Sequence, residues 1–265
     1  MGRVVILLKE DFQNEENQPI LAVKNVSKNF NKVQALRNVS MEVYKGDVVG
    51  LLGDNGAGKS TLINIISGNF PADEGEVFLE GKKVHFNSPY EAHSAGIETV
   101  YQNSPVCIDS SVYENFFIGR ELVNNFLGLK IVRSSDMQKV TLKTLSDIGI
   151  SIPSAKAEIG LLSGGQRQAI ILGRFFHWGG KVALLDEPFA ALGVAESRNG
   201  LKLIRDVSKK GLPIILITHN IEYAFQIINK YVVLRHGRVV GAGNREDVSV
   251  EDIVSMITGA IEIND

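Results

Sequence analysis

The sequence predicts an α/β protein with a largely parallel sheet and an inserted helical subdomain. Short apolar runs at 182–185 and 214–217 are typical of buried strands. Helical apolar spacing at 195–210 lies between them, and this alternation of strand and helix is the pattern of a parallel sheet. Residues 103–162 instead show helical spacing without a strong strand, so we expect the helical subdomain there.

The other elements follow from local patterns in chain order. Residues 20–26 and 39–43 alternate apolar and polar side chains, as half-buried strands do, and 75–81 predicts a strand closed by a glycine turn. The run Ser88-Pro89-Tyr90-Glu91 is a capping box with proline at the first helical position, so a helix begins there. We also expect a strand at 97–101, helices at 112–118, 137–148, 163–176, 221–228 and 250–258, and a hairpin at 232–240.

Composition bounds the class of protein. The 265 residues are 44% apolar and 22% charged with a net charge of −2, and no block of like charges indicates nucleic acid. The only cysteine, Cys107, excludes an intramolecular disulfide, and the apolar run at 4–8 is too short for a membrane span. These criteria predict a cytoplasmic protein. We expect a tail at 1–18, a nucleotide-binding core at 19–102, a helical subdomain at 103–170 and the rest of the core at 171–265.

A glycine-rich turn at 53–60 carries the first chemistry. It matches G-x-x-x-x-G-K-[ST], follows the apolar strand 48–52 and precedes residues at helical spacing, which is the context that a P-loop requires. The glycines allow consecutive N–H groups to face phosphates at a helix N-terminus. Lys59 can reach the outer phosphates, and the Ser60 hydroxyl suits Mg²⁺. The alternative, a chance glycine turn before Lys-Ser, is disfavoured by this context.

Polar residues follow three further strands. Asp186 and Glu187 end one, His219 follows another and Gln102 follows a third, and functional groups gather at the carboxyl ends of parallel strands. Asp186 can hold Mg²⁺, Glu187 can deprotonate water, and the Gln102 amide suits Mg²⁺ or water. The structural alternatives are an acidic turn before Pro188 and an ordinary structural histidine.

The run Leu162-Ser163-Gly164-Gly165-Gln166 carries a second glycine signal. Ser163 and Gln166 form a capping box, so a plain helix start explains two of these residues. It does not explain two glycines in a first turn, where glycine is costly. Close approach of a phosphate to the backbone at a helix N-terminus does explain them.

These motifs in this order resemble the ATP-binding subunits of ABC transporters, over about residues 20–245. The runs VQALRNVSMEVYKGDVVGLLGDNGAGKSTL, SPYEAHSAGIETVYQ and DEPFAALGVAES are similar to those of bacterial carbohydrate importers. The resemblance implies a P-loop NTPase core of ABC type, with a mixed or parallel sheet, an antiparallel β subdomain and an inserted helical subdomain. It also implies ATP hydrolysis with Mg²⁺, on the inner face of the cell membrane.

The resemblance also implies a role for each matching residue. Phe30 stacks on adenine, although a strand-end core aromatic is the other reading. Glu187 is the general base, His219 holds the γ-phosphate, and Gln102 completes the metal and water site. Metal ligands are Ser60, Gln102 and Asp186. Further nucleotide contacts come from Gly53, Asn55, Gly56, Ala57, Gly58, Lys59, Ser60 and Thr61, and, toward ATP bound by the other subunit of a dimer, from Ser163, Gly164, Gly165 and Gln166.

The expected partners are a second ATPase subunit (most simply a homodimer), membrane permease subunits and, indirectly, a solute-binding protein. Gly193 stands where most of the family carries aspartate, and Phe189 where threonine is usual. Two other functions compete with import of a monosaccharide. One is a soluble ABC ATPase acting on ribosomes or DNA, which usually has paired modules or basic segments. The other is a nucleotide-binding regulatory module without turnover, against which Lys59 and Glu187 argue.

Overall fold

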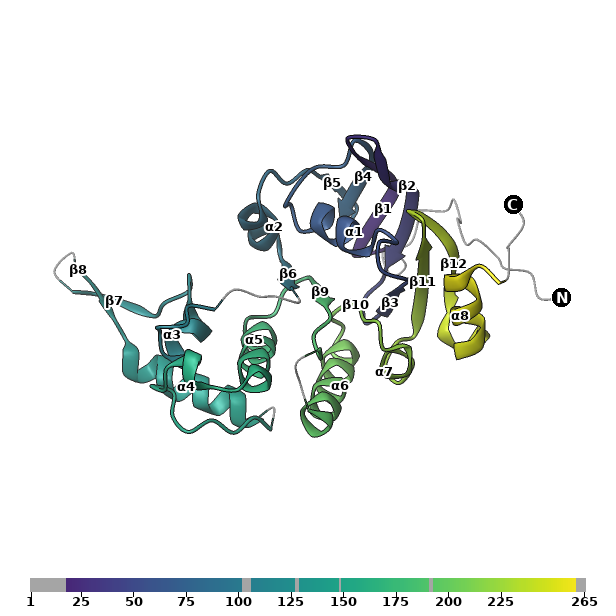
Figure 1. The fold of residues 1–265 in the computed structure, drawn as a ribbon. Helices are drawn as coiled ribbons and strands as arrows, with labels where there is room; N and C mark the ends of the chain where they lie inside the picture. The colour runs from purple at the N-terminus through teal and green to yellow at the C-terminus, as the bar shows by residue number, and fades with distance from the viewer. Residues whose placement is uncertain (1–17, 102–105, 127–128, 148, 191–192, 261–265) are drawn as a thin grey trace. The chain divides into compact units, whose positions relative to one another are not determined.

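The structure is a computed structural model that describes residues 18–101, 106–126, 129–147, 149–190 and 193–260. Contacts divide the chain into two compact units (Figure 1). Unit 1 comprises Met1–Thr99, Gly180–Glu187 and Ile204–Asp265, and unit 2 comprises Val100–Gly179 and Pro188–Leu203.

A six-stranded sheet in the order β12-β11-β3-β10-β9-β6 forms the centre of unit 1. Strands β11, β3, β10 and β9 run parallel, and β12 is antiparallel to β11. The sequence prediction of a mixed, mostly parallel sheet is therefore confirmed. The strands are β3 Val48–Leu52, β6 Ile97–Val100, β9 Val182–Asp186, β10 Ile214–Ile217, β11 Lys230–Arg235 and β12 Arg238–Asn244.

A second sheet of unit 1 is antiparallel, in the order β2-β1-β4-β5. In β2, the alternate residues Val39, Met41 and Val43 are buried, because one face of the strand packs on the core, whereas β1 buries Leu21, Ala22 and Val23 in succession. Positive φ at Asn25 and Asn38 accompanies breaks in the β1–β2 register. The strands are β1 Leu21–Phe30, β2 Val33–Val43, β4 Glu74–Leu79 and β5 Lys82–Val84.

One hydrophobic core joins the two sheets through helix α1 (Lys59–Ile66). Leu62 and Ile66 of α1 are buried with Leu36 of the antiparallel sheet and Leu51 of the central sheet. Burying such an aliphatic side chain contributes about 1.5–3 kcal/mol each. The core therefore fixes where α1 begins, and with it the loop that precedes α1.

Three further helices of unit 1 are α2 Pro89–Ala95, α7 Ile221–Phe225 and α8 Val250–Thr258. The expected start of α2 is confirmed, since the Ser88 hydroxyl accepts the N–H of Glu91. The box is not reciprocal, however, because the Glu91 carboxylate accepts from the N–H of Asn87 and not of Ser88. Helix α6 (Val194–Lys209) begins among the residues of unit 2 and ends among those of unit 1.

Unit 2 is built on helices that pack around a separate apolar cluster. Phe116 and Phe117 of α3, Leu145 of α4 and Ile170 of α5 are all buried in it. The helices are α3 Val112–Phe117, α4 Ser134–Asp147 and α5 Gly164–Trp178, with a short 3-10 turn at Ile159–Leu161.

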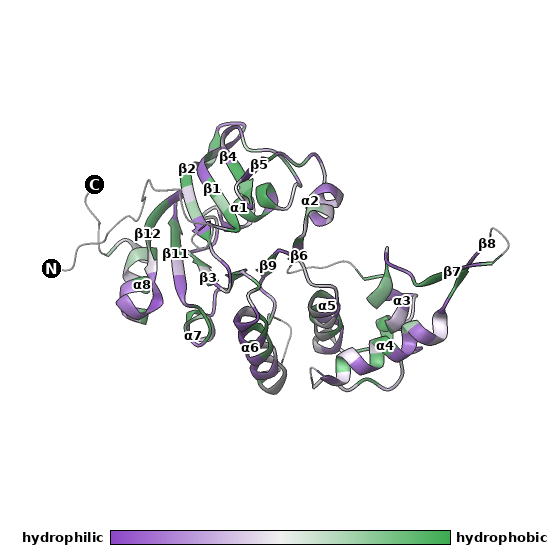
Figure 2. Ribbon diagram, turned by 180° about the vertical axis from the view of Figure 1, so that it is seen from behind, coloured by the Kyte–Doolittle hydropathy of each residue, from purple (hydrophilic) through white to green (hydrophobic). Residues whose placement is uncertain are grey.

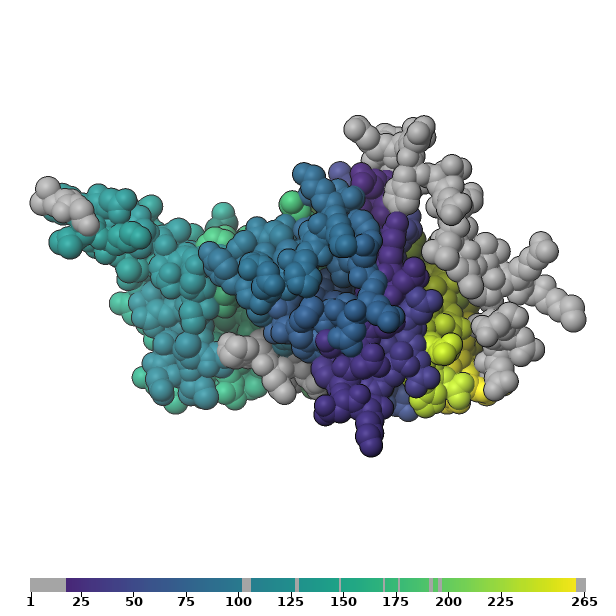
Figure 3. Space-filling model, turned by 90° about the horizontal axis from the view of Figure 1, so that it is seen from above, coloured from purple at the N-terminus to yellow at the C-terminus, as the bar shows by residue number. Residues whose placement is uncertain are grey.

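The expectation of no strong strand between 103 and 162 is wrong. Strands β7 (Val123–Phe126) and β8 (Leu129–Val132) form an antiparallel hairpin between α3 and α4. All eight strand residues are exposed, so no buried face imposed an alternating pattern that the sequence could show. Figure 3 shows this hairpin as an arm that projects beyond the helices of unit 2.

Candidate functional site

The candidate site of unit 1 lies where three adjacent strands end. Strand β10 pairs on one side with β3 and on the other with β9, all in parallel. The loop 53–58 follows β3, Glu187 follows β9, and His219 follows β10 by two residues. Parallel strands bring their carboxyl ends to one edge, so the topology gathers these groups.

The P-loop depends on two glycines that its own fold requires. Gly53 has φ +149°, and a Cβ there would lie 2.3 Å from the carbonyl oxygen of Leu234. Gly58 has φ +108°, and a Cβ would lie 2.7 Å from the carbonyl oxygen of Ala35. Any other residue would meet both backbone strain and a backbone clash at either position. The loop is thus clamped between β11 and β2, and α1 begins at Lys59 without a side-chain cap.

Lys59 lies half-buried at the start of α1. Its amine donates hydrogen bonds to the carbonyl oxygens of Gly53 (2.8 Å) and Asp54 (2.9 Å). Burial lowers the pKa of Lys59, and the carboxylates of Glu187, Asp186 and Asp54 oppose that shift. The amine therefore stays beside the loop N–H groups, in reach of an anion placed there.

Glu187 is held by His219, which follows β10, and by the end of β10 itself. Its Oε1 accepts the backbone N–H of His219 at 2.7 Å and lies 3.0 Å from the His219 Nδ1. Its own N–H donates to the carbonyl of Ile217 at 2.9 Å, and its φ is +50°. A non-glycine residue in that region costs about 1 kcal/mol or more, and such strain gathers at functional sites. The Glu187 side chain is 12% exposed and that of His219 75%, so the pair faces solvent from the histidine side.

Asp186 is the second acidic group at this edge. Burial raises the pKa of its carboxyl, the neighbouring Glu187 adds to the rise, and Lys59 opposes it. A hydroxyl from Ser60 and a carboxylate from Asp186 are oxygen donors of the kind that Mg²⁺ takes when phosphates supply other ligands. Within the described part of the chain, no group of three or more His, Cys, Asp or Glu side chains could hold a metal ion by itself.

Phe30 ends β1, and it is 43% exposed. Its ring makes an edge-on contact with Phe70 at 5.3 Å between centroids, and the Lys28 amine lies 5.7 Å from its centroid. It pairs in register with Val33, two residues before Ala35, whose carbonyl touches Gly58. An exposed aromatic face on the strand pair beside the P-loop fits either stacking on a base or capping of the sheet end.

The glycine pair of unit 2 lies in the first turn of α5. The reciprocal capping box is confirmed: the Ser163 hydroxyl accepts the Gln166 N–H at 3.1 Å, and the Ser163 N–H donates to the Gln166 side chain at 3.0 Å. The side chain of Gln166 is thus already engaged in the cap. Ser163 and Gly164 are exposed, so this helix start is accessible to an anion.

Two further places complete the description. Gln102, a candidate for metal and water contacts, lies outside the described residues.

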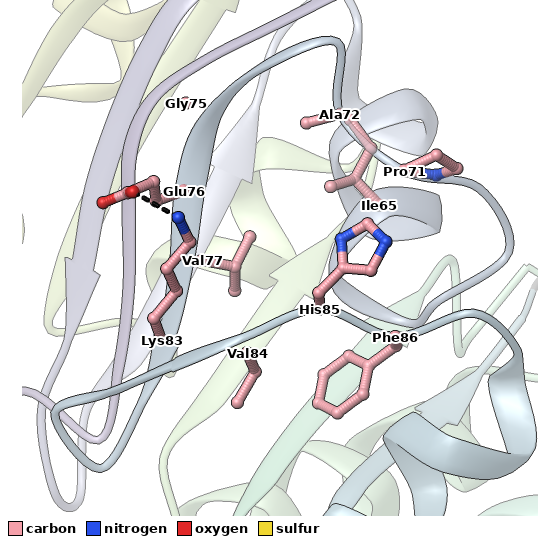
Figure 4. Close-up of a pocket in the computed structure, with 10 residues that line it drawn as sticks. All are labelled: Ile65, Pro71, Ala72, Gly75, Glu76, Val77, Lys83, Val84, His85 and Phe86. Carbon is pink, nitrogen blue, oxygen red and sulfur yellow. Dashed lines mark hydrogen bonds and ion pairs between the residues drawn. The ribbon is translucent and has the colours of Figure 1, made fainter.

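A cavity of about 70 Å³ lies against β4, β5 and the end of α1, with an ion pair between Lys83 and Glu76 on its wall (Figure 4). That volume is far below the roughly 300 Å³ of a small-molecule pocket, so this is not the nucleotide site.

Sequence reasoning missed the groups that hold the site together. The backbone N–H of His219 binds Glu187, and Gly237 donates its N–H to the carbonyl of Ala57 beneath the P-loop. Such backbone contacts leave no side-chain signature. Gly237 stood in an expected hairpin turn, which was the only available signal.

The family model described as ABC transporter matches residues 36–190. The xylose/arabinose import ATP-binding protein of Sulfolobus acidocaldarius is 44% identical over 90% of this chain and 94% of its own length. The fructose import ATP-binding protein of Rhizobium meliloti is 43% identical over 92% and 96%. The chain belongs to the ABC transporter family, as one of its ATP-binding cassettes.

Solved structures agree with this assignment. An ATP-binding cassette of an ABC transporter in its ADP conformation has a TM-score of 0.74 at 28% identity, over 91% of this chain and 96% of that one. A nucleotide-free cassette from an ABC transporter gives the same TM-score and identity over 89% and 95%. A bacterial cassette solved as a dimer shares the fold, with a TM-score of 0.74 at 23% identity over 85% and 98%.

Proposed function

We propose that this protein is the ATP-hydrolysing subunit of an importer, with a monosaccharide as the transported solute. The observation that carries the hydrolytic part is the Glu187 carboxylate at the end of β9, held by His219 after β10, the strand that lies between β9 and the P-loop strand β3. The sugar assignment is supported by relatives at 43–44% identity that import pentoses or fructose. Transport of a sugar by this chain rests on that similarity alone.

In this proposal the chain's own groups divide the work. Backbone N–H groups of 53–61 and the Lys59 amine bind the phosphates, and Phe30 stacks on the base. Glu187 takes a proton from the attacking water, and His219 orients Glu187 and contacts the γ-phosphate. Bound Mg²⁺ neutralises phosphate charge, and Ser60, Asp186 and Gln102 would hold it.

The helix start at Ser163, Gly164, Gly165 and Gln166 would face ATP bound to a second subunit. Hydrolysis then needs two copies, and the simplest assembly is a homodimer. Permease subunits in the membrane would receive the motion, and a solute-binding protein would act through them. Among the described residues, no helix is long and apolar enough to cross a membrane. Because the chain would act on those permease subunits, the proposal places it peripherally on the cytoplasmic face of the membrane.

The test is Glu187→Gln, which keeps the shape and hydrogen-bonding reach of the side chain and removes its basicity. We expect ATP turnover to fall about 10²–10⁴-fold, the range of a lost general base. ATP should still bind, and the variant should sediment as a dimer in saturating MgATP. Full turnover by Glu187→Gln, or a monomer under those conditions, would contradict the mechanism.

A pull-down from detergent-solubilised native membranes tests the transport part separately. Recovery of a polytopic membrane protein with the tagged chain supports a permease partner. Recovery of ribosomal proteins or nucleic acid would leave the ATP chemistry standing and favour the soluble alternative. Failure of Glu187→Gln to affect turnover, together with weak turnover by the wild type, would favour a regulatory module.

A further inference from the structure

The β7–β8 hairpin presents an apolar surface that nothing in the described chain covers. Phe126 is 62% exposed, Leu129 68% and Ile131 51%. Cross-strand pairing places Phe126 opposite Leu129 and Asn124 opposite Ile131. Because side chains alternate between faces along a strand, the three apolar residues share one face. Figure 2 shows hydrophobic residues along this hairpin.

An isolated two-stranded hairpin is at best marginally stable in water. At the base of this one, the Arg133 N–H donates to the carbonyl of Leu122 at 2.7 Å. Val123 and Val132 pair on the opposite face and are also more than 40% exposed. Among the described residues nothing covers either face of this hairpin, and an exposed apolar patch of this kind marks a contact with a membrane or a partner.

The charge around the hairpin restricts what that cover can be. Residues 119–145 hold five basic and two acidic side chains, a net charge of +3 in a chain of net −2. One basic residue, Arg133, is neutralised by Asp136 at 2.7 Å. Lys130 on the hairpin and Lys139 and Lys143 on α4 are all exposed. Leu142 lies beside the two α4 lysines and is 43% exposed, so α4 repeats the mixture of apolar and basic side chains.

We propose that the β7–β8 hairpin, with the basic face of α4, docks on an anionic lipid surface. Phe126, Leu129 and Ile131 enter the headgroup boundary, and Lys139 and Lys143 of α4 contact the phosphates, as in other peripheral membrane segments. Lys130 lies on the opposite face of the hairpin, with Val123 and Val132, and adds only longer-range attraction to the anionic surface. A second copy of the chain would bring the same positive segment against itself. A permease segment could supply apolar cover, and the test separates it from lipid. The proposal goes beyond ATP-driven import, because it gives the chain its own contact with the bilayer.

The experiment uses the full-length chain and protein-free vesicles, so its outcome does not depend on ATP turnover or on a permease. One set is phosphatidylcholine, and the other is phosphatidylcholine with phosphatidylglycerol. We expect co-sedimentation with the anionic vesicles and release at high salt. The triple variant Phe126→Ser, Leu129→Ser, Ile131→Ser should bind them at least about tenfold more weakly. The charge variant Lys139→Glu, Lys143→Glu should bind several-fold more weakly without any loss of apolar surface.

The matched control is Tyr90→Ser, which removes a large side chain that is 77% exposed on α2 of unit 1. It should bind vesicles as the wild type does. ATP binding by each variant reports that the fold is intact. Equal binding by the triple variant, or no dependence on phosphatidylglycerol, would overturn the proposal. So would failure to bind protein-free anionic vesicles by a chain that native membranes retain, since that result would make the hairpin a protein-docking element.

Discussion

Two helix starts in this chain carry glycines, and their structural settings differ. Before α1, Gly53 and Gly58 have left-handed φ values, and any side chain would strike the backbone of β11 or β2. At the start of α5, Gly164 and Gly165 lie within the helix, behind a complete Ser163–Gln166 capping box. The fold itself therefore requires the P-loop glycines. Nothing in the backbone of α5 requires the second pair, which lowers helix propensity.

The two helix starts thus represent two different roles of glycine. One role is to allow a backbone shape that the fold needs, and the other is to leave room for a ligand beside the backbone. In the P-loop, Gly53 and Gly58 each serve both the fold and the proposed phosphate contacts. A substitution at either position should therefore lower stability and ATP binding together. At α5, a substitution should separate them, because neither glycine has a positive φ and alanine can adopt the helical backbone there. Stability and turnover measured on the same variants can therefore test the comparison directly.

The largest effect is expected from Gly53→Ala. A Cβ 2.3 Å from the Leu234 carbonyl forces β11 or the loop to move, and Ala must also adopt the left-handed φ. We expect a loss of about 3 kcal/mol or more in unfolding free energy, and no measurable ATP binding. Denaturant titration and equilibrium nucleotide binding measure the two.

Gly56→Ala is the matched stability control within the same loop. Gly56 also has a positive φ (+77°), but a Cβ there would meet nothing within 4 Å. It should cost about 1 kcal/mol, from strain alone. Equal losses for the two variants would mean that the clash with β11 does not shape the loop.

Gly165→Ala should separate stability from function. Alanine is the better helix former, so the unfolding free energy should stay unchanged or rise by up to about 1 kcal/mol. Turnover should fall at least about tenfold, because a methyl group would stand where the phosphate of a partner-bound ATP approaches. Phosphate release and thermal unfolding measure the two quantities.

Ser135→Ala is the control for Gly165→Ala, since Ser135 is an exposed residue in the first turn of α4 of the same unit. Its turnover should equal that of the wild type. If Gly165→Ala also kept full turnover, the glycines of α5 would need another explanation and the proposed cross-dimer contact would be lost.

Side-chain packing explains the glycine at position 200. Gly200 lies inside α6, and a Cβ there would lie 2.5 Å from Cε1 of Phe189, whose side chain is buried. The aromatic ring occupies the space of the missing side chain, which gives a physical reason for the unusual Phe189. Gly200→Ala should destabilise the protein by about 1–3 kcal/mol through overpacking.

The sign of that effect should reverse when the ring is removed. In a Phe189→Ala background, the three atoms nearest to that Cβ are gone, and Gly200→Ala should stabilise by up to about 1 kcal/mol, as alanine does in a helix interior. Denaturant unfolding of the four proteins completes a double-mutant cycle. The same destabilisation in both backgrounds would show that Phe189 and Gly200 are not coupled.

Local sequence patterns were sufficient to predict an element where only one physical explanation fits the residue types present. The glycine-rich turn between an apolar strand and a helix gave the P-loop, and Ser163 with Gln166 gave the start of α5. The β7–β8 hairpin was missed because its residues are exposed on both faces and leave no alternating pattern. The φ of Glu187 and its bond from the His219 N–H were also invisible, since both depend on the β9–β10 pairing.

The smallest expected effect is a gain in stability, from Asp186→Asn. Burial and Glu187 raise the pKa of the Asp186 carboxyl, so the ionised form is less stable in the folded chain than in the unfolded one. This costs folding free energy above its ordinary pKa, near about 4, and the cost disappears as the pH falls to that value. Asp186→Asn should therefore stabilise the protein slightly at pH 7 and less as the pH is lowered, because solvent screening of this partly exposed carboxyl keeps the gain small.

The same variant should lose ATP turnover, because the neutral amide of the asparagine would supply no negative charge to the proposed Mg²⁺ site. Asp109→Asn, at an exposed position in unit 2, should change neither quantity. A less stable Asp186→Asn at pH 7 would mean that the ionised carboxylate stabilises the strand end. Asp186 would then resemble Gly53 and Gly58 of the P-loop, because the same residue would serve both the stability of the fold and the proposed function. A gain in stability with a loss of turnover would instead show that Asp186 resembles the glycines of α5. Each of these residues would then contribute to ligand binding while lowering the stability of the fold.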